Sequence, residues 1–229
     1  MSYAKELEAT AKALVAPGKG ILAADESTGT IKKRFDKIKV ENTEDNRRDY
    51  REMLFTTKGC EEFVSGVILF DETLRQKASD GTPLAQILGS KGIIPGIKVD
   101  KGPTQLAGTA DEQITDGLDG LRARLAEYRG LGARFAKWRA VISIADGKPS
   151  DHCLLTNAHA LARYAGLCVD EGLVPIVEPE ILMDGTHTIE RSHEVTERTL
   201  HFVFHALAEQ LVPLEQILLK PNMVLSGYE

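Results

Sequence analysis

The stretch Ile217-Leu218-Leu219-Lys220-Pro221-Asn222 places a lysine directly after three aliphatic residues and directly before a proline. Near-continuous aliphatic runs are typical of strands in parallel sheets, which are buried on both faces. Pro221 has no N–H group to donate to a neighbouring strand, so we expect the strand to end at Lys220. A buried ammonium is costly unless it is paired or loses its proton, and a neutral lysine amine can form a Schiff base. The stretch therefore predicts a reactive lysine at the carboxyl end of a buried strand.

The chain has 229 residues, of which 42% are hydrophobic and 27% charged, and its formal net charge is −6. This composition is typical of globular proteins, and the mixed, acidic charge argues against nucleic-acid binding. The three cysteines are widely spaced, so neither a disulfide framework nor a zinc site is predicted. No apolar run reaches membrane-spanning length, and the N-terminus lacks the apolar core of a signal peptide. We therefore predict a reduced, cytoplasmic protein without a nucleic-acid or membrane partner.

Strand and helix patterns alternate along the whole chain. Six apolar runs are predicted to be strands: 20–25, 64–70, 93–99, 135–144, 173–180 and 217–220. Between them, apolar residues at helical spacing indicate helices, and three of these helices begin with the favourable capping residues Thr43, Ser150 and Thr188. In the helix that Thr43 caps, we expect the apolar residues Tyr50, Met53 and Leu54 to face inward.

Alternation of this kind predicts an α/β fold with a parallel sheet and crossover helices. Two architectures fit, a doubly wound open sheet and a TIM (β/α)₈ barrel. Only six strands are visible, and the nine residues after Lys220 show no helix pattern. The chain is therefore interpreted either as an open six-stranded sheet or as the first six βα units of a barrel. In the second case, residues 1–229 form a single barrel domain that is incomplete at its C-terminus.

Charged residues gather at the carboxyl ends of five of the six predicted strands, which is where parallel α/β folds place their sites. They are four cations and four carboxylates: Lys98, Lys137, Arg139, Lys220, Asp25, Asp100, Glu178 and Glu180. A second cation such as Lys137 favours the amine form of Lys220. Either Glu178 or Glu180 could move the protons that Schiff-base formation requires. Lys98 and Arg139 then suit an anionic substrate such as a sugar phosphate.

The histidines give weaker signals. The run from His193 to Glu197 resembles the H-E-x-x-H zinc motif but lacks its second histidine, so we interpret it as a solvated helix face. His201 and His205 are four residues apart and could hold a metal, but no third ligand stands at a telling spacing. No metal site and no other cofactor is predicted.

At several places the sequence resembles the class I fructose-bisphosphate aldolase family. The resemblance extends over the whole chain in order, and it is carried by six runs: APGKGILAADESTG (16–29), ENTE with NRR (41–44 and 46–48), GIKVDKG (96–102), FAKWR (135–139), VPIVEPE (174–180) and LLKPNMV (218–224). It implies a (β/α)₈ barrel and a lyase of glycolysis and gluconeogenesis. The implied reaction is the reversible cleavage of fructose 1,6-bisphosphate to dihydroxyacetone phosphate and glyceraldehyde 3-phosphate.

The resemblance also implies roles for individual residues. Lys220 corresponds to the Schiff-base lysine, Glu178 to the general acid/base, and Lys137 to a partner in the carbinolamine steps. Asp25 is expected near the substrate hydroxyl that loses its proton as the carbon–carbon bond breaks, and Glu180 is expected to orient Lys220. The residues expected to bind phosphate or hydroxyl groups are Lys98, Arg139, Arg34 and Ser27.

Two departures from the family pattern leave alternatives open. The family continues for two more strands, which bring further phosphate-binding residues, and the usual Thr-Pro-Gly appears here as Leu225-Ser226-Gly227. One alternative is a catalytically incompetent fragment or interaction module of the same fold. Another is a different Schiff-base aldolase. The resemblance further implies a homo-oligomer, specifically a homotetramer.

Overall fold

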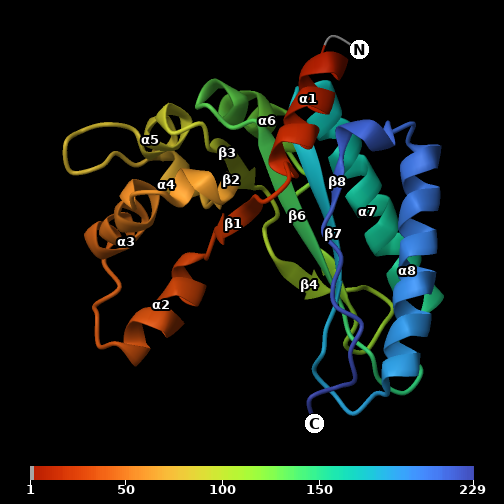
Figure 1. The fold of residues 1–229 in the computed structure, drawn as a ribbon. Helices are drawn as coiled ribbons and strands as arrows, with labels where there is room; N and C mark the ends of the chain where they lie inside the picture. The colour runs from red at the N-terminus through yellow and green to blue at the C-terminus, as the bar shows by residue number, and fades with distance from the viewer. Residues whose placement is uncertain (1–2) are drawn as a thin grey trace.

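A computed structural model describes residues 3–229, and its central feature is one sheet of six parallel strands (Figure 1). The strands are β1 (Gly20–Ala24), β2 (Val64–Leu69), β3 (Ile94–Lys98), β6 (Phe135–Ile142), β7 (Val174–Ile181) and β8 (Leu218–Leu219). Each lies beside the strand that precedes it in the sequence, in the order β1-β2-β3-β6-β7-β8. A doubly wound sheet reverses its strand order at a switch point, whereas a TIM barrel keeps the sequence order. The predicted barrel is therefore confirmed as an open barrel of six parallel strands, and the doubly wound alternative is wrong.

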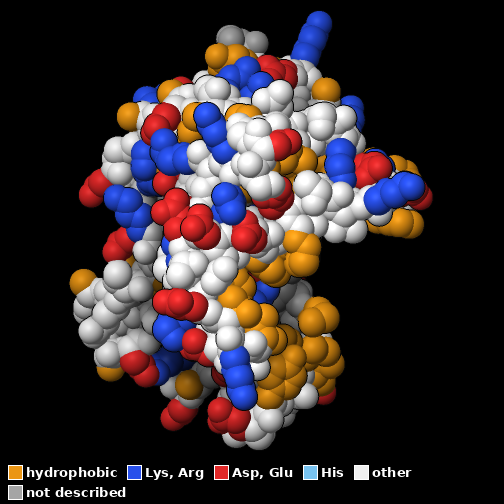
Figure 2. Space-filling view, turned by 90° about the vertical axis from the view of Figure 1, so that its left-hand side faces the viewer, with side chains coloured by type: hydrophobic (Ala, Val, Ile, Leu, Met, Phe, Trp, Pro, Cys, Tyr) orange, Lys and Arg blue, Asp and Glu red, His pale blue; other side chains and the backbone are white. Residues whose placement is uncertain are grey.

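Helices cover the outside of the sheet. They are α1 (Ala4–Leu14), α2 (Thr28–Lys37), α3 (Glu44–Thr56), α4 (Asp71–Arg75), α5 (Leu84–Ser90), α6 (Leu121–Gly130), α7 (Asp151–Asp170) and α8 (Ile189–Glu209), with short 3₁₀ turns at Cys60–Glu62 and Leu214–Gln216. The two long helices α7 and α8 pack against each other and against β7, and Figure 1 shows them on the opposite side of the sheet from α2, α3 and α5. On the face that carries α2 to α5, side chains of both charges are interspersed (Figure 2).

The predicted strands agree with the observed ones to within one or two residues at each end. The three predicted helix caps are confirmed. The side-chain oxygens of Thr43, Ser150 and Thr188 accept hydrogen bonds from the backbone N–H groups three residues on, at 3.1, 3.1 and 3.3 Å. These bonds satisfy backbone donors that have no partner inside the helix, which explains why the helices begin where they do.

Three elements have no counterpart among the predicted ones. Helix α2 follows β1 directly, and a hairpin of β4 (Pro103–Gln105) and β5 (Gln113–Thr115) replaces part of an expected loop. The short helix α4 follows β2. Helix α2 buries only Ile31 and Phe35, one turn apart, and it starts on Thr28-Gly29-Thr30, residues with low helix propensity. Its cap is the side chain of Ser27, which accepts a hydrogen bond from the N–H of Thr30 at 3.3 Å.

The inward face of α3 was predicted correctly only in part, since Leu54 packs against the core and Tyr50 is half-buried, whereas the prediction for Met53 is wrong. Met53 is 57% exposed, and the buried residues of this helix are Arg47, Arg51 and Phe55. The apolar pattern misleads here because two arginines occupy inward positions, where they are paired with carboxylates and backbone carbonyl groups. Buried charge of this kind is tolerated only with such partners.

Aromatic residues fill the space on both sides of β6. The indole of Trp138 is fully buried, with its ring centroid 5.4 Å from that of Tyr164 in α7. On the other side, the Phe135 ring occupies the space beside Gly66 of β2 and Gly96 of β3. A Cβ atom at Gly96 would lie only 2.3 Å from this ring, so the glycine makes room for the aromatic side chain.

The two edges of the sheet are β1 and β8. A groove of about 370 Å³ lies between them, with an apolar lining that includes Ile21, Ile68 and Leu218, and Lys220 stands at one side of it. Within residues 3–229, none of the helices combines the length and the hydropathy that crossing a membrane would require.

Candidate active site

The strand-end position of Lys220 follows from the pairing of its backbone. Its N–H group donates to the carbonyl oxygen of Val177 in β7 at 2.9 Å, directly after the two-residue strand β8. Pro221 then ends the pairing, as its missing N–H group predicts. The side chain is 47% exposed, because β8 is an edge strand with no strand on its other side.

The centre of the site is the buried carboxylate of Glu178, which is only 3% exposed. Its Oε1 atom accepts a hydrogen bond from the Lys220 ammonium, and its Oε2 atom lies 3.2 Å from the Lys137 ammonium. Lys137 in turn donates to Oδ2 of Asp25 at 3.1 Å. Lys137 of β6, Glu178 of β7 and the residues that directly follow β1 and β8 thus form a chain of alternating charge, Lys220–Glu178–Lys137–Asp25, which we call the strand-end relay.

Burial and charge act against each other in the strand-end relay. Burial alone would lower the pKa of Lys137, but the nearby carboxylates of Asp25 and Glu178, together with Asp100, raise it above its ordinary value. Lys137 is therefore an ammonium at neutral pH. The relay thus holds a charged lysine on one oxygen of Glu178 and Lys220 on the other.

Lys98 and Asp100 lie beside the relay at the end of β3, with Nζ and Oδ1 3.5 Å apart. Burial raises the pKa of Asp100, while the charges of Lys98 and Lys137 act to lower it. Its carboxylate also accepts hydrogen bonds from the backbone N–H groups of Gly102 and Arg139, at 3.2 and 3.4 Å. This carboxylate holds the loop after β3 against β6.

Glu180 is placed differently from the expectation that it orients Lys220. Its carboxylate is paired with the guanidinium of Arg139, on the neighbouring strand, whereas the contact with Lys220 belongs to Glu178. In the register of β7 against β8, Val177 is paired with Leu219, so Lys220 lies beside Glu178. Arg139 is also paired with Glu178, but its long side chain reaches the next carboxylate on the same face of β7, Glu180. Arg139, Glu180, Lys220 and Asn222 line a cavity of about 370 Å³ on the more polar side of Lys220.

Ser27 and Arg34 lie on α2, next to the end of β1. The Ser27 hydroxyl caps the helix, and Arg34 forms an ion pair with Glu26 while remaining 59% exposed. Among the hydrogen bonds and ion pairs of residues 3–229, none joins either side chain to the strand-end relay. The structure thus brings Asp25, Lys137, Glu178 and Lys220 into direct contact and leaves these two at the periphery.

Sequence reasoning missed a set of residues that supports this end of the barrel. Glu26 and Glu72 follow β1 and β2, and each is paired with an arginine of α3, Arg51 and Arg47 respectively. The available signal was the spacing of Arg47 and Arg51, one helical turn apart, with a carboxylate directly after each of the first two strands. Arginines normally face solvent, so this spacing alone did not indicate a buried pair.

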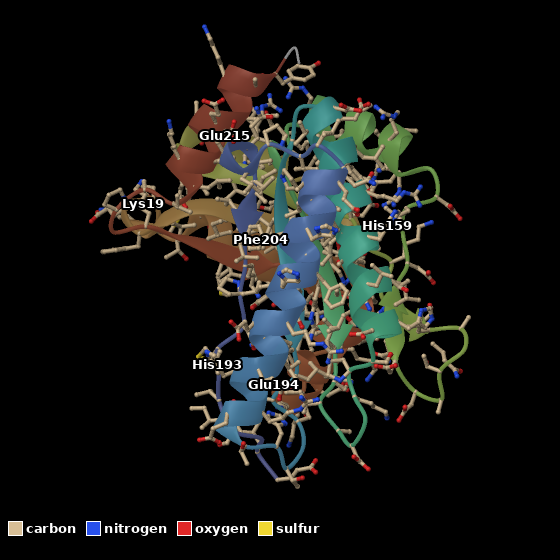
Figure 3. All side chains as sticks on the ribbon, turned by 90° about the vertical axis from the view of Figure 1, so that its right-hand side faces the viewer. Lys19, His159, His193, Glu194, Phe204 and Glu215 are labelled. Carbon is tan, nitrogen blue, oxygen red and sulfur yellow. The ribbon has the colours of Figure 1, made fainter. Side chains whose placement is uncertain are left out.

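The histidines set aside as metal ligands lie on the outside of α8. His193, Glu194, His201 and His205 are all exposed, and Figure 3 shows His193 and Glu194 on the outer side of the helix. No group of three or more His, Cys, Asp or Glu side chains in the described part of the chain is arranged to hold a metal ion. A larger cavity of about 810 Å³ lies between β5 and α7, and none of the predicted site residues lines it.

The open barrel and the strand-end relay define a class of protein, the α/β barrels that hold a lysine against a carboxylate at the carboxyl ends of their strands. Comparison with known families specifies the class further. The model of the glycolytic class I fructose-bisphosphate aldolases matches residues 6–229. The chain belongs to this family.

Individual relatives agree with this assignment. A protein of Xanthomonas campestris named as a probable class 1 fructose-bisphosphate aldolase is 61% identical over 97% of this chain and 67% of its own length. A cytosolic fructose-bisphosphate aldolase of Arabidopsis thaliana is 58% identical over 99% of this chain and 63% of its own length. A solved structure of the Plasmodium falciparum aldolase, in complex with TRAP and an inhibitor, superposes with a TM-score of 0.98 at 56% identity, over the whole of this chain and 66% of that one. The chain thus spans about two thirds of the length of these relatives.

Proposed function

We propose that this chain carries the Schiff-base chemistry of a class I aldolase that cleaves fructose 1,6-bisphosphate reversibly, with Lys220 as the nucleophile. The observation that carries the proposal is the contact of one buried carboxylate, Glu178, with both lysines. Glu178 can accept the proton of the Lys220 ammonium, which frees the amine lone pair, and Lys137 remains charged beside it.

The chemistry follows from this arrangement. The Lys220 amine attacks the ketone carbon of the sugar, the carbonyl oxygen takes up a proton, and the nitrogen gives up a proton to Glu178, which leaves a neutral carbinolamine. Loss of water, with a second proton delivered to the departing oxygen, gives the iminium ion. Glu178 is the proton carrier for both transfers, and Lys137 stabilises negative charge on the oxygen.

Bond cleavage then uses the iminium ion as an electron sink. A base removes the proton of the hydroxyl group on the far side of the breaking bond, the electron pair of that bond moves to the iminium nitrogen, and the aldehyde product leaves. Asp25, held by Lys137 at 3.1 Å, is the base that we assign to this step. Protonation of the remaining enamine and hydrolysis of the imine release dihydroxyacetone phosphate and restore Lys220.

The cations at the rim suit the phosphate groups of the substrate. Lys98 lies at the end of β3 and Arg139 within β6, next to the relay, while Ser27 caps the adjoining helix α2 and Arg34 lies on it. Arginine binds phosphate through two parallel N–H groups, so Arg139 is the strongest candidate once Glu180 releases it. We further propose a cytoplasmic location, since relatives from Arabidopsis thaliana and Spinacia oleracea are named as cytosolic and cytoplasmic isozymes. The homo-oligomeric assembly that the family resemblance implies stays a prediction.

A second candidate is favoured by the exposure of Lys220. The side chain is 47% exposed, and the chain spans about two thirds of the length of its relatives. In this alternative the chain keeps the fold and the relay but not turnover, and it acts as an interaction module. Measured cleavage of fructose 1,6-bisphosphate by the 229-residue protein, lost in Lys220→Ala, supports the aldolase. A folded protein without measurable cleavage supports the alternative.

A further inference from the structure

Arg51 is the most completely buried charge in α3, with an exposed fraction of 0% for the whole residue. Burying a guanidinium is costly, so its partners indicate what the burial secures. Its Nη2 atom donates to the backbone carbonyl of Glu26 at 2.9 Å, and its Nε atom donates to that of Ala24 at 3.4 Å. Nη2 also lies 3.4 Å from the Glu26 carboxylate.

The two carbonyl groups stand on either side of Asp25. Strand β1 ends at Ala24, and helix α2 begins at Thr28, so the backbone of the short connection between them has no ladder or helix to fix it. Arg51 holds this connection at the residue before Asp25 and at the residue after it. The Asp25 side chain accepts a hydrogen bond from Nζ of Lys137 in β6 at 3.1 Å.

We propose that Arg51 is a positioning residue of the site, which clamps the backbone on both sides of Asp25 and thereby keeps this carboxylate within reach of Lys137 and of the substrate. The catalytic part of this inference rests on the proposed aldolase function, whereas the structural part does not. Arg51 touches neither Lys137 nor Lys220 among the contacts of residues 3–229, so it acts through Asp25.

The same helix supplies a matched control. Arg47 lies one turn before Arg51, is also buried, and pairs through two hydrogen bonds with Glu72 after β2, at 2.8 and 2.6 Å. Its remaining contacts are with Asn42, and none is with residues 24–26. Arg47→Met therefore removes a comparable buried ion pair from α3 without releasing the backbone around Asp25.

The pKa of Lys137 reports the position of Asp25 without requiring turnover. The carboxylates that face Lys137 are Asp25 after β1, Asp100 after β3 and Glu178 in β7. The cations are Lys220, on the other oxygen of Glu178, and Lys98, which is paired with Lys137 across β3 and β6 and lies 3.5 Å from Asp100. If Asp25 moves away, Lys137 loses a stabilising anion and its pKa falls. Removing the positive charge of Arg51 has the opposite direct effect, because loss of a nearby cation favours the charged form of a lysine. A downward shift therefore identifies displacement of Asp25.

The experiment titrates the lysine side chains of ¹³C,¹⁵N-lysine-labelled protein by NMR, with Lys137 assigned from Lys137→Met. We expect a lower pKa of Lys137 in Arg51→Lys and Arg51→Met, in the direction of the shift in Asp25→Asn, and no shift in Arg47→Met. Arg51→Lys keeps the positive charge but loses the separate Nε and Nη2 donors of the guanidinium group. It therefore tests the proposal even if the methionine variant does not fold. A folded Arg51→Lys protein with the wild-type pKa at Lys137 overturns the proposal.

Kinetics add a second readout that separates this inference from the proposed function. In an active protein, Arg51→Lys lowers kcat by about tenfold to a hundredfold with little change in KM, because a misplaced base slows bond cleavage more than binding. Arg47→Met retains the wild-type kcat. If the wild-type chain shows no turnover, the aldolase proposal fails for this chain, and the Lys137 titration still decides the role of Arg51. A wild-type kcat in Arg51→Lys contradicts the catalytic part alone.

Discussion

At the scale of single residues, the site depends on one carboxylate that contacts two ammonium groups. Glu178 is buried and contacts Lys220 through one oxygen and Lys137 through the other. An amide in its place keeps the shape but can neither accept a proton from Lys220 nor return it during dehydration.

Glu178→Gln is therefore expected to slow imine formation and turnover by about two to four orders of magnitude. Pre-steady-state trapping of the imine with borohydride measures the first effect, and an assay of substrate cleavage measures the second. Glu180→Gln serves as the control, since Glu180 is paired with Arg139 and not with Lys220. A Glu178→Gln protein with the full rate would identify Glu180 as the better acid/base candidate.

Lys137 links two carboxylates, and its removal leaves both of them buried without this partner. We expect Lys137→Met to lower the free energy of unfolding by about 3–5 kcal/mol at neutral pH, the usual cost of breaking a buried ion pair from one side. Because the pKa of Lys137 is raised in the folded protein, its stabilisation is complete below the unfolded value of 10.5 and is lost as the pH rises through the folded value. Urea titrations at pH 8 to 11.5 measure the free energy of unfolding of both proteins. The difference between wild type and Lys137→Met should be constant up to pH 10.5 and should shrink above it. A difference that grows with pH would contradict this account.

At the scale of the elements, close packing between strands explains residues that look unfavourable in the sequence. Gly96 lies within β3, where a glycine normally weakens a strand. The Phe135 ring fills the space that its missing side chain leaves.

Gly96→Ala should therefore destabilise the protein by about 1–3 kcal/mol, since the added Cβ atom overpacks the barrel interior. Chemical denaturation measures this effect, and the double variant with Phe135→Leu is expected to recover part of it. Gly89→Ala in α5 is the control, because the added methyl group meets no atom within 4 Å and alanine favours the helix. Equal stabilities of the two alanine variants would show that the ring does not set the requirement for glycine.

The sequence was sufficient for features that follow from local patterns. The six strands, three helix caps and the strand-end charges could be predicted because each depends on a few consecutive residues. The inward face of α3 could not, because Arg51 is buried by partners more than twenty residues away. For the same reason the sequence could not assign Lys220 to Glu178 and Arg139 to Glu180. The first pair depends on the register of β7 against β8, and the second on how far the Arg139 side chain reaches along β7.

At the scale of the whole molecule, one large hydrophobic core joins the sheet to α1 and the outer helices, with a small second cluster around Ile142, Ile181 and Val195. We propose that residues 1–229 fold as a single domain on this core. Trp138, the only tryptophan, is fully buried between β6 and α7 and reports the packing of that region.

A single domain predicts that the tryptophan fluorescence and the far-ultraviolet circular dichroism change together in urea, with one midpoint. The dichroism signal averages over all helices, so α2 to α5 contribute to it although they lie far from α7, against which Trp138 packs, in Figure 1. The Gly96→Ala variant should move both midpoints equally. Two separate midpoints would divide the molecule into parts that unfold independently.

The net charge of the whole molecule has the same sign as the proposed substrate. The net charge is −6, yet the proposed substrate carries two phosphate groups, so binding depends on the local cations Lys98, Lys137 and Arg139 at the strand ends. The central claim is that Lys220, among these lysines, forms the covalent bond. Its half-exposed side chain allows access, and its contact with Glu178 provides the route for its proton.

The most direct measurement is the site of covalent capture. The folded protein is incubated with dihydroxyacetone phosphate, reduced with borohydride and mapped by peptide mass spectrometry, with Glu178→Gln and Lys220→Ala run in parallel. The account predicts a reduced adduct on Lys220 in the wild-type protein, much slower labelling in Glu178→Gln and none in Lys220→Ala. A folded wild-type protein whose Lys220 stays unlabelled, or whose adduct lies on Lys137 or Lys98, would contradict the account.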